Sequence, residues 1–164
     1  MARLVLTDAS PLIGLARVEG LAWLDALFGK VWMPQEVRRE VLSGSGAGDE
    51  QAIEEAIAAG ILHVWPEAMP EQPVLPDLDE GETACIRIAL NAGAEALLLM
   101  DERAGRAVAL EHGLRVAGTA AVIGMAKARG LIGSAKAVFS RLHESDFRIS
   151  AAVITTILRR VGES

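Results

Sequence analysis

The stretch LVLTDASPLIGLARV, residues 4–18, joins a short apolar run to a helical pattern through one carboxylate. Residues 4–7 are typical of a buried strand, and from Pro11 the apolar residues recur with the spacing of a helix. Asp8 stands where the expected strand ends, just before the expected helix. In an open parallel sheet, ligands bind beyond the carboxyl ends of the strands, where the strand order reverses. Asp8 is therefore a candidate functional residue.

The rest of the chain repeats this alternation of strands and helices. Further strands are expected at residues 30–33, 61–65, 95–100 and 115–118. Helices are expected at residues 11–28 (broken near Gly20), 34–42, 50–60, 78–91, 102–112, 119–129, 134–144 and 150–161. Strands alternating with helices of this length indicate βαβ units, and hence an α/β fold with a parallel sheet and helices on both faces. Residues 66–77 hold four of the six prolines and form an extended connector.

Length and composition narrow the class of protein. A chain of 164 residues is expected to form one domain, residues 1–164, with a full core. It is 51% hydrophobic, with a mean hydropathy of +0.31. No apolar run approaches the roughly 20 residues that span a bilayer, and Asp8 interrupts the N-terminal run too early for a signal peptide. The single Cys85 excludes an internal disulfide, so we expect a cytoplasmic protein without membrane contact.

The charges of the chain are unevenly distributed. The net charge is −6, which argues against a protein that merely coats nucleic acid. Residues 1–101 carry −11, whereas residues 102–164 carry +5. This division is compatible with a cation-binding cleft beside a phosphate-attracting flank, and equally with an uneven scatter of solvated charge.

Four acids are candidate metal ligands: Asp8, Glu40, Glu82 and Asp101. Each also has a structural interpretation. Asp8 and Asp101 can cap the helices that follow them, Glu82 can form a capping box with Asp79, and Glu40 can lie on a solvated face. Carboxylates that converge without a counterion repel one another, so a cleft shared by all four indicates a hard divalent cation. Such a cation supports phosphodiester cleavage.

The order of several motifs resembles the PIN domain, and looks closest to the branch of VapC-type toxins. The motifs are LTDASPLIGLAR, P-x-x-V-x-x-E-V from Pro34, LDEGE from Leu78, LLLMDERAGRAVA from Leu97 and the late GLRVAGT. The resemblance runs from residue 3 to about residue 130, and C-terminal helices follow at about 134–161. The stretch FRIS, residues 147–150, together with the last helix also looks like that branch's ending. It implies a three-layer α/β/α fold with strand order 3-2-1-4-5.

The resemblance also implies an activity, a cofactor and partners. It implies an endoribonuclease that depends on Mg²⁺ or Mn²⁺ and cleaves RNA, often as a homodimer inhibited by an antitoxin protein. By motif, the catalytic and metal-binding acids are Asp8, Glu40, Glu82 and Asp101. Ser10 matches a hydroxyl residue that supports the hydrogen bonding of the metal site.

Three charged residues follow Asp101 closely in the sequence. Glu102 stands where many relatives have a second Asp, so it is placed beside the metal-binding set rather than in it. Arg103 and Arg106 are candidates for binding substrate phosphates, although ion pairs with surface acids account for them equally well.

Other readings remain open from the sequence alone. One is a PIN-like module that binds RNA or protein without cleavage. A receiver-like or dehalogenase-like phosphotransfer domain also places Asp at strand ends, but the chain lacks a D-x-D pair after its first strand and a Lys after a late one. The apolar stripe of residues 150–161 either packs within the domain or, given the high apolar content, contributes to a homodimer.

Overall fold

A parallel sheet forms the centre of the molecule. The computed structural model describes residues 4–44, 48–93 and 95–163. In these ranges five strands pair in the order β3-β2-β1-β4-β5, all parallel. The strands are β1 (Leu4–Thr7), β2 (Val31–Met33), β3 (Leu62–Val64), β4 (Ala96–Leu99) and β5 (Arg115–Ala117).

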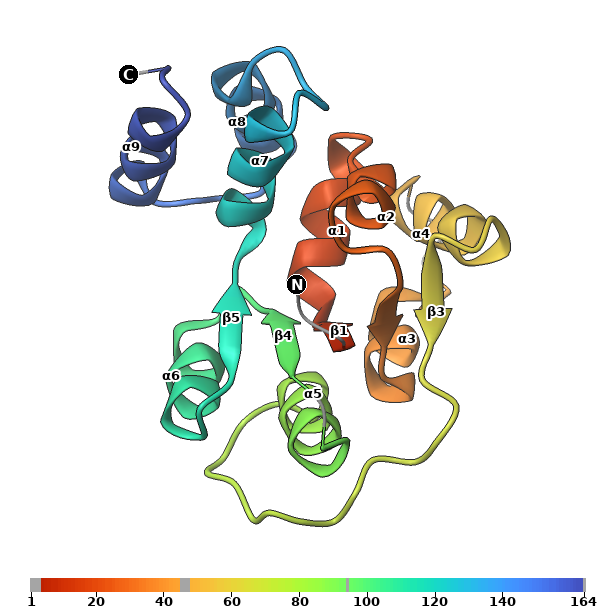
Figure 1. Ribbon diagram of the computed structural model, residues 1–164. Helices are drawn as coiled ribbons and strands as arrows, with labels where there is room; N and C mark the ends of the chain where they lie inside the picture. The colour runs from red at the N-terminus through yellow and green to blue at the C-terminus, as the bar shows by residue number, and fades with distance from the viewer. Residues whose placement is uncertain (1–3, 45–47, 94, 164) are drawn as a thin grey trace.

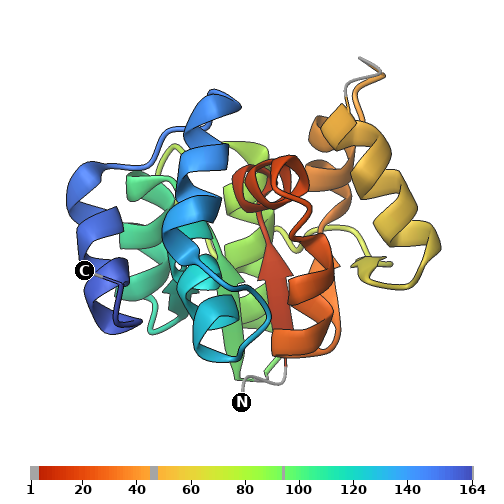
Figure 2. The ribbon, with the colours of Figure 1, turned by 90° about the horizontal axis from the view of Figure 1, so that it is seen from above.

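Helices cover both faces of the sheet, so the predicted three-layer α/β/α fold and its strand order are confirmed. Figure 1 shows α5 (Glu80–Asn91) and α6 (Arg103–Glu111) on one side, and α1 (Ala9–Arg17), α2 (Leu21–Phe28) and α7 (Thr119–Ala128) on the other. Outside them lie α3 (Gln35–Val41), α4 (Gly48–Ala58), α8 (Ala135–Glu144) and α9 (Ala151–Arg160). Seen from above, α4 and α9 lie at opposite ends of the molecule (Figure 2). Within the described ranges, no helix is long and apolar enough to cross a membrane.

Strands β1 and β4 are buried on both faces, which explains their unbroken apolar sequence. Successive side chains of a strand point to opposite faces. Accordingly, Leu6 and Leu98 pack with α5 and α6, whereas Val5 and Leu97 pack with the helices of the other layer. Each large apolar side chain buried in this way contributes about 1.5–3 kcal/mol.

The strand order reverses between β1 and β4, which are paired with Thr7 opposite Leu99. The Asp8 N–H donates to the Leu99 carbonyl at 2.9 Å, so the ladder extends to the residue where β1 ends. Asp101 follows β4 at the same edge of the sheet. The ends of β1 and β4 therefore lie side by side, as the strand order 3-2-1-4-5 implies, at the topological switch point.

Element boundaries agree closely with the sequence patterns. The expected break near Gly20 separates α1 from α2, and Glu19 there has a φ of 57°. The helix expected from Pro34 begins one residue later, because Pro34 itself is extended, with a ψ of 156°. Between the helices expected at residues 34–42 and 50–60, residues 45–47 lie outside the described ranges.

The C-terminal helix, α9, packs against α7 and α8 of the same domain. Ile157 of α9 is buried against α7, where a Cβ on Gly124 would lie 2.9 Å from the Ile157 Cγ2. Ile154, Leu158 and Val161 of the predicted apolar stripe are partly buried beside it, and Val153 is 44% exposed. The Glu163 carboxylate then accepts hydrogen bonds from the Ala135 N–H, at 2.6 Å, and from neighbouring groups at the start of α8.

Replacing Gly124 with valine tests this packing. The new side chain must push Ile157 away from α7, so we expect Gly124→Val to lower the free energy of unfolding by about 1–3 kcal/mol. Urea denaturation monitored by circular dichroism measures the change. Gly133→Val is the matched control, because nothing lies within 4 Å of the site of its Cβ. Equal effects of the two substitutions would contradict the close approach of α9 to α7.

Candidate metal centre

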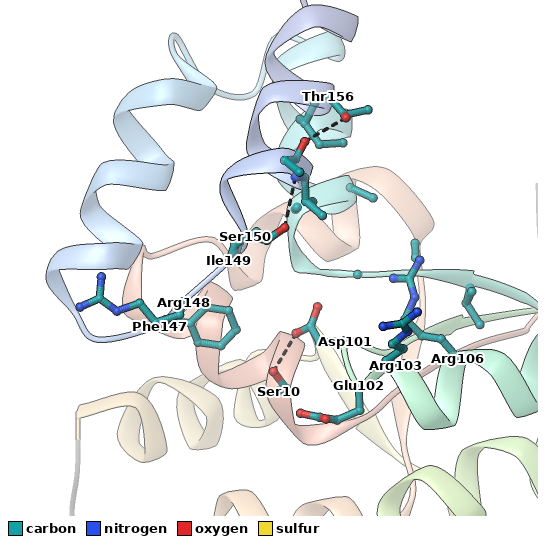
Figure 3. A pocket seen from close by; sticks show the side chains of 18 of the residues that line it. Ser10, Asp101, Glu102, Arg103, Arg106, Phe147, Arg148, Ile149, Ser150 and Thr156 are labelled. Atoms are coloured by element: carbon teal, nitrogen blue, oxygen red, sulfur yellow. Dashed lines mark hydrogen bonds between the residues drawn. The ribbon is translucent and has the colours of Figure 1, made fainter.

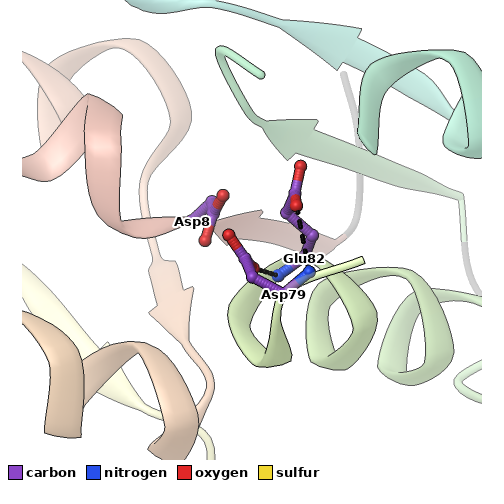
Figure 4. A group of neighbouring side chains, drawn as sticks. All are labelled: Asp8, Asp79 and Glu82. Carbon is purple, nitrogen blue, oxygen red and sulfur yellow. Dashed lines mark hydrogen bonds between the residues drawn. The ribbon is translucent and has the colours of Figure 1, made fainter. Parts of the chain in front are cut away.

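Three carboxylates meet beyond the carboxyl end of β1. Asp8, Asp79 and Glu82 each offer an oxygen, and these oxygens lie within 4.8 Å of one another. Asp8 extends from the strand end, while Asp79 and Glu82 come from the first turn of α5, and Figure 4 shows them facing one another. The three carboxylates therefore come from the end of a strand and the start of a helix that are far apart in the sequence.

Asp79 and Glu82 are oriented by the start of α5. The Asp79 side chain accepts a hydrogen bond from the Glu82 N–H at 2.8 Å, and the Asp79 N–H donates to Glu82 Oε1 at 3.3 Å. The capping box predicted as the structural interpretation of Glu82 is therefore confirmed. It leaves Glu82 Oε2 unused, so the cap and a ligand role are compatible.

Two carboxylate oxygens in this group are buried without a partner. Within the described ranges, Asp8 Oδ1 and Glu82 Oε2 have no hydrogen-bond donor. Asp8 is 3% exposed and Glu82 is 5% exposed. An unsatisfied buried polar group costs about 1–3 kcal/mol, and more when it is charged. A divalent cation with oxygen ligands fits this donor set, since it would satisfy both oxygens and neutralise their charge.

Glycines on two helices make room for these oxygens. A Cβ on Gly81, in α5, would lie 2.5 Å from Asp8 Oδ1. A Cβ on Gly105, in α6, would overlap Glu82 Oε2. Any larger residue at either position would displace a carboxylate, so the glycines of LDEGE and RAGR shape the cluster.

The surroundings favour the protonated form of these acids. Burial raises the pKa of Asp8 from the usual 3.8 to about 7, with smaller contributions from the charges of Asp79, Glu82 and Glu40, while the Ala9 N–H acts in the opposite direction. The pKa of Glu82 is raised by burial and then by the charge of Asp79. The same two causes raise the pKa of Glu40. A bound cation would reverse this preference.

Comparison with known families identifies the fold. A family model described as PIN domain matches residues 4–163. The chain belongs to the PIN-domain family. PIN domains are generally metal-dependent nucleases that act on RNA, which agrees with an acidic cluster able to hold a divalent metal. A comparison with curated proteins gives no match.

In this PIN domain Asp101 is held by hydrogen bonds. Its Oδ2 accepts from Ser10 Oγ and Thr119 Oγ1, each at 2.7 Å, and its Oδ1 accepts from the Thr119 N–H at 2.7 Å. The interpretation of Asp101 as the cap of the helix after it is wrong, because Glu102 is at that N-cap. Asp101 instead caps α7 and ties it to α1.

The structure places the other predicted residues around this core. Glu40, on α3, is exposed but close enough for its charge to raise the pKa of Asp8. The charge of Glu102 acts likewise on Glu82. Arg103 is exposed, and Arg106 donates to the Met100 carbonyl at 3.3 Å. Neither arginine forms an ion pair within the described ranges, so the interpretation of these two as partners of surface acids is wrong there.

Sequence reasoning missed Asp79 as a member of the cluster. Its role in the capping box accounted for it fully. A signal was nevertheless present, because the N-cap residue and the third residue of a helix project from the same side of its first turn. If Glu82 reaches the end of β1, Asp79 lies beside it.

The buried Asp8 predicts an unusual pH dependence in the absence of metal. Since its pKa is about 7 in the folded chain and 3.8 when unperturbed, the stability it contributes is full below about pH 4 and is lost as the pH rises through 7. We expect Asp8→Asn to unfold with nearly the wild-type free energy at pH 4. At pH 8, without metal, we expect it to be more stable than wild type by about 2–4 kcal/mol.

Denaturant titrations in EDTA at the two pH values measure this difference. Asp25→Asn on the exposed surface of α2 is the control, and it is expected to change neither value. A difference between wild type and Asp8→Asn that is the same at pH 4 and pH 8 would contradict the prediction.

Proposed function

We propose that this PIN domain is a metal-dependent endoribonuclease. The observation that carries the proposal is the pair of buried oxygens, Asp8 Oδ1 and Glu82 Oε2, which lack hydrogen-bond partners among the described residues and lie beside a third carboxylate. Keeping two such oxygens together is costly for a domain that only serves as a scaffold. For a domain that binds a cation and a phosphodiester, the same arrangement is a preformed ligand set.

The proposed ligands are Asp8, Asp79 and Glu82, with Mg²⁺ or Mn²⁺ as the cation. Glu40 and Asp101, which the motifs also imply, complete the set as outer acids. Glu40 acts on Asp8 through its charge, and Asp101 retains one unused lone pair on Oδ1. Bound at this position, a divalent cation supplies the Lewis acid that activates water and stabilises the charge developed in phosphodiester cleavage.

The remaining residues have supporting roles in the proposal. Ser10 holds Asp101 in place, and Glu102 adds negative charge near Glu82. Arg103 and Arg106 offer guanidinium groups to the phosphates of the substrate, because neither forms an ion pair with a described residue.

We further propose that the protein is a VapC-like toxin of a toxin–antitoxin pair. The support is the ordered set of motifs from LTDASPLIGLAR to GLRVAGT. In this proposal, residues 1–164 act as a single domain in the cytoplasm, cleave RNA and are inhibited by an antitoxin protein.

Substitution of Asp8 tests the activity. Removing a charged ligand should lower Mg²⁺- or Mn²⁺-dependent cleavage of a labelled RNA by about a hundredfold or more. It should also abolish the rise in melting temperature that Mg²⁺ causes by binding the folded state. We therefore expect Asp8→Asn to be folded, inactive and unresponsive to Mg²⁺, with Asp25→Asn as the active control. RNA binding without cleavage by the wild type would contradict the nuclease proposal.

We also predict a homodimer. The chain is 51% hydrophobic, more than one small core requires, and an isologous interface would bury the excess. Exposed apolar side chains such as Val74, at 78%, and Leu131, at 39%, are available on its surface. Light scattering at micromolar concentration should give twice the 17.3 kDa of one chain. A mass of one chain that is unchanged on concentration would show the prediction to be wrong.

A further inference from the structure

A groove of about 920 Å³ runs from Ser10 and Asp101 to the C-terminal helix. Its inner end is formed by Ser10, Asp101 and Glu102, and its walls by α6 and by the segment that leads into α9 (Figure 3). Helix α6 links the groove to the cluster, because its Gly105 lies against Glu82 Oε2 while its Arg103 and Arg106 line the groove. The groove therefore lies beside the proposed metal site.

The groove is rich in arginine. Four arginines line it against two acids, Asp101 and Glu102, and one of those acids is already held by three hydrogen bonds. Arg103 on α6 and Arg160 on α9 form no hydrogen bond or ion pair with any part of the chain that the structure describes. In a protein with a net charge of −6, unpaired arginines gathered in one groove indicate an anionic occupant.

An aromatic ring lies in the same groove, next to the acidic end. The far edge of the Phe147 ring abuts α1, where a Cβ on Gly14 would lie 2.8 Å from its Cζ. Gly14 is one turn beyond Ser10, which bonds to Asp101, and Figure 3 shows the ring beside both residues. Phe147 is partly exposed and lines the groove, so its ring is accessible from the groove.

We propose that this groove binds a single-stranded RNA segment adjacent to the cleavage site, with Arg160 binding phosphate and Phe147 stacking on a base. The inference rests on the proposed function, and it adds a binding surface contributed by the C-terminal part of the chain. Single-stranded nucleic acid alternates charged phosphates with flat apolar bases, which matches arginines interleaved with apolar side chains. An acidic protein would match the arginines but has no equivalent requirement for an accessible ring.

The chain offers a matched pair of substitutions for a test. Arg159 and Arg160 are neighbours in the last turn of α9, both exposed, but Arg160 lines the groove and Arg159 does not. Arg159→Ala therefore removes the same charge from the same helix end as Arg160→Ala. Phe147→Leu keeps an apolar side chain beside Gly14 and removes the ring. Thermal melts of all three variants verify that they are folded.

Binding is measured without cleavage, by fluorescence anisotropy of a 5′-fluorescein-labelled dodecauridylate in EDTA at several salt concentrations. We expect Arg160→Ala to weaken binding and to reduce the slope of log Kobs against log salt concentration by about 0.7, the loss of one phosphate contact. Phe147→Leu should weaken binding about fivefold or more with the slope unchanged. Arg159→Ala should resemble wild type.

Several results would overturn the proposal. They are absence of binding by the wild type, equal effects of Arg159→Ala and Arg160→Ala, and displacement of the RNA by polyglutamate as effective as by unlabelled RNA at equal charge. The last result would assign the groove to an acidic protein. If Arg160→Ala and Phe147→Leu leave metal-dependent cleavage unchanged, RNA binding in the groove is refuted and the nuclease proposal stands. If RNA binds in the groove but is not cleaved, the nuclease proposal is refuted and RNA binding in the groove stands.

Discussion

The burial of two carboxylate oxygens, on Asp8 and Glu82, without a partner in the part of the chain that the structure describes is the constraint around which this region is built. Each oxygen lies against a helix at a glycine, Gly81 or Gly105, where a side chain would displace it. Asp8 is fixed by the last bond of the β1–β4 ladder, and Glu82 by the capping box of α5. Neither acid can withdraw into solvent without disturbing a strand end or a helix start. Burial raises the pKa of Asp8 to about 7. Without a cation, the protonated form of this carboxyl is therefore favoured.

The fold followed from the sequence because its main signals are local or periodic. Continuous apolar runs such as residues 95–100 indicate strands covered on both faces, and their alternation with helices leaves few topologies. The strand order itself came from the resemblance to the PIN domain, not from the periodicity. Boundaries were less certain, as at Pro34, because the competition between a cap and a first helical turn depends on backbone angles that the sequence does not specify.

The acidic site was predictable only in part. The end of the first strand predicts Asp8, whereas the capping role of Asp79 explains that residue without a ligand role and so hides it. The surroundings of Asp101 could not be foreseen either. Its hydroxyl donors are Ser10 and Thr119, which are 91 and 18 residues away along the chain. Such contacts depend on how α1 and α7 pack at the end of β4, and this packing cannot be read from residue spacing in the sequence.

The division of charge along the chain acquires a physical meaning in this topology. The acidic first part supplies β1 and α5, and hence the cluster, whereas the basic second part supplies α6 and α9, and hence the arginines of the groove. At physiological salt, charges influence one another over about 8 Å, so an unneutralised cluster opposes a polyanion at the inner end of the groove, where Glu102 stands. A cation that removes this opposition strengthens the binding of the polyanion, and the polyanion must strengthen the binding of the cation by the same factor. The opposed charges of the two halves therefore couple metal binding to substrate binding in the proposed enzyme.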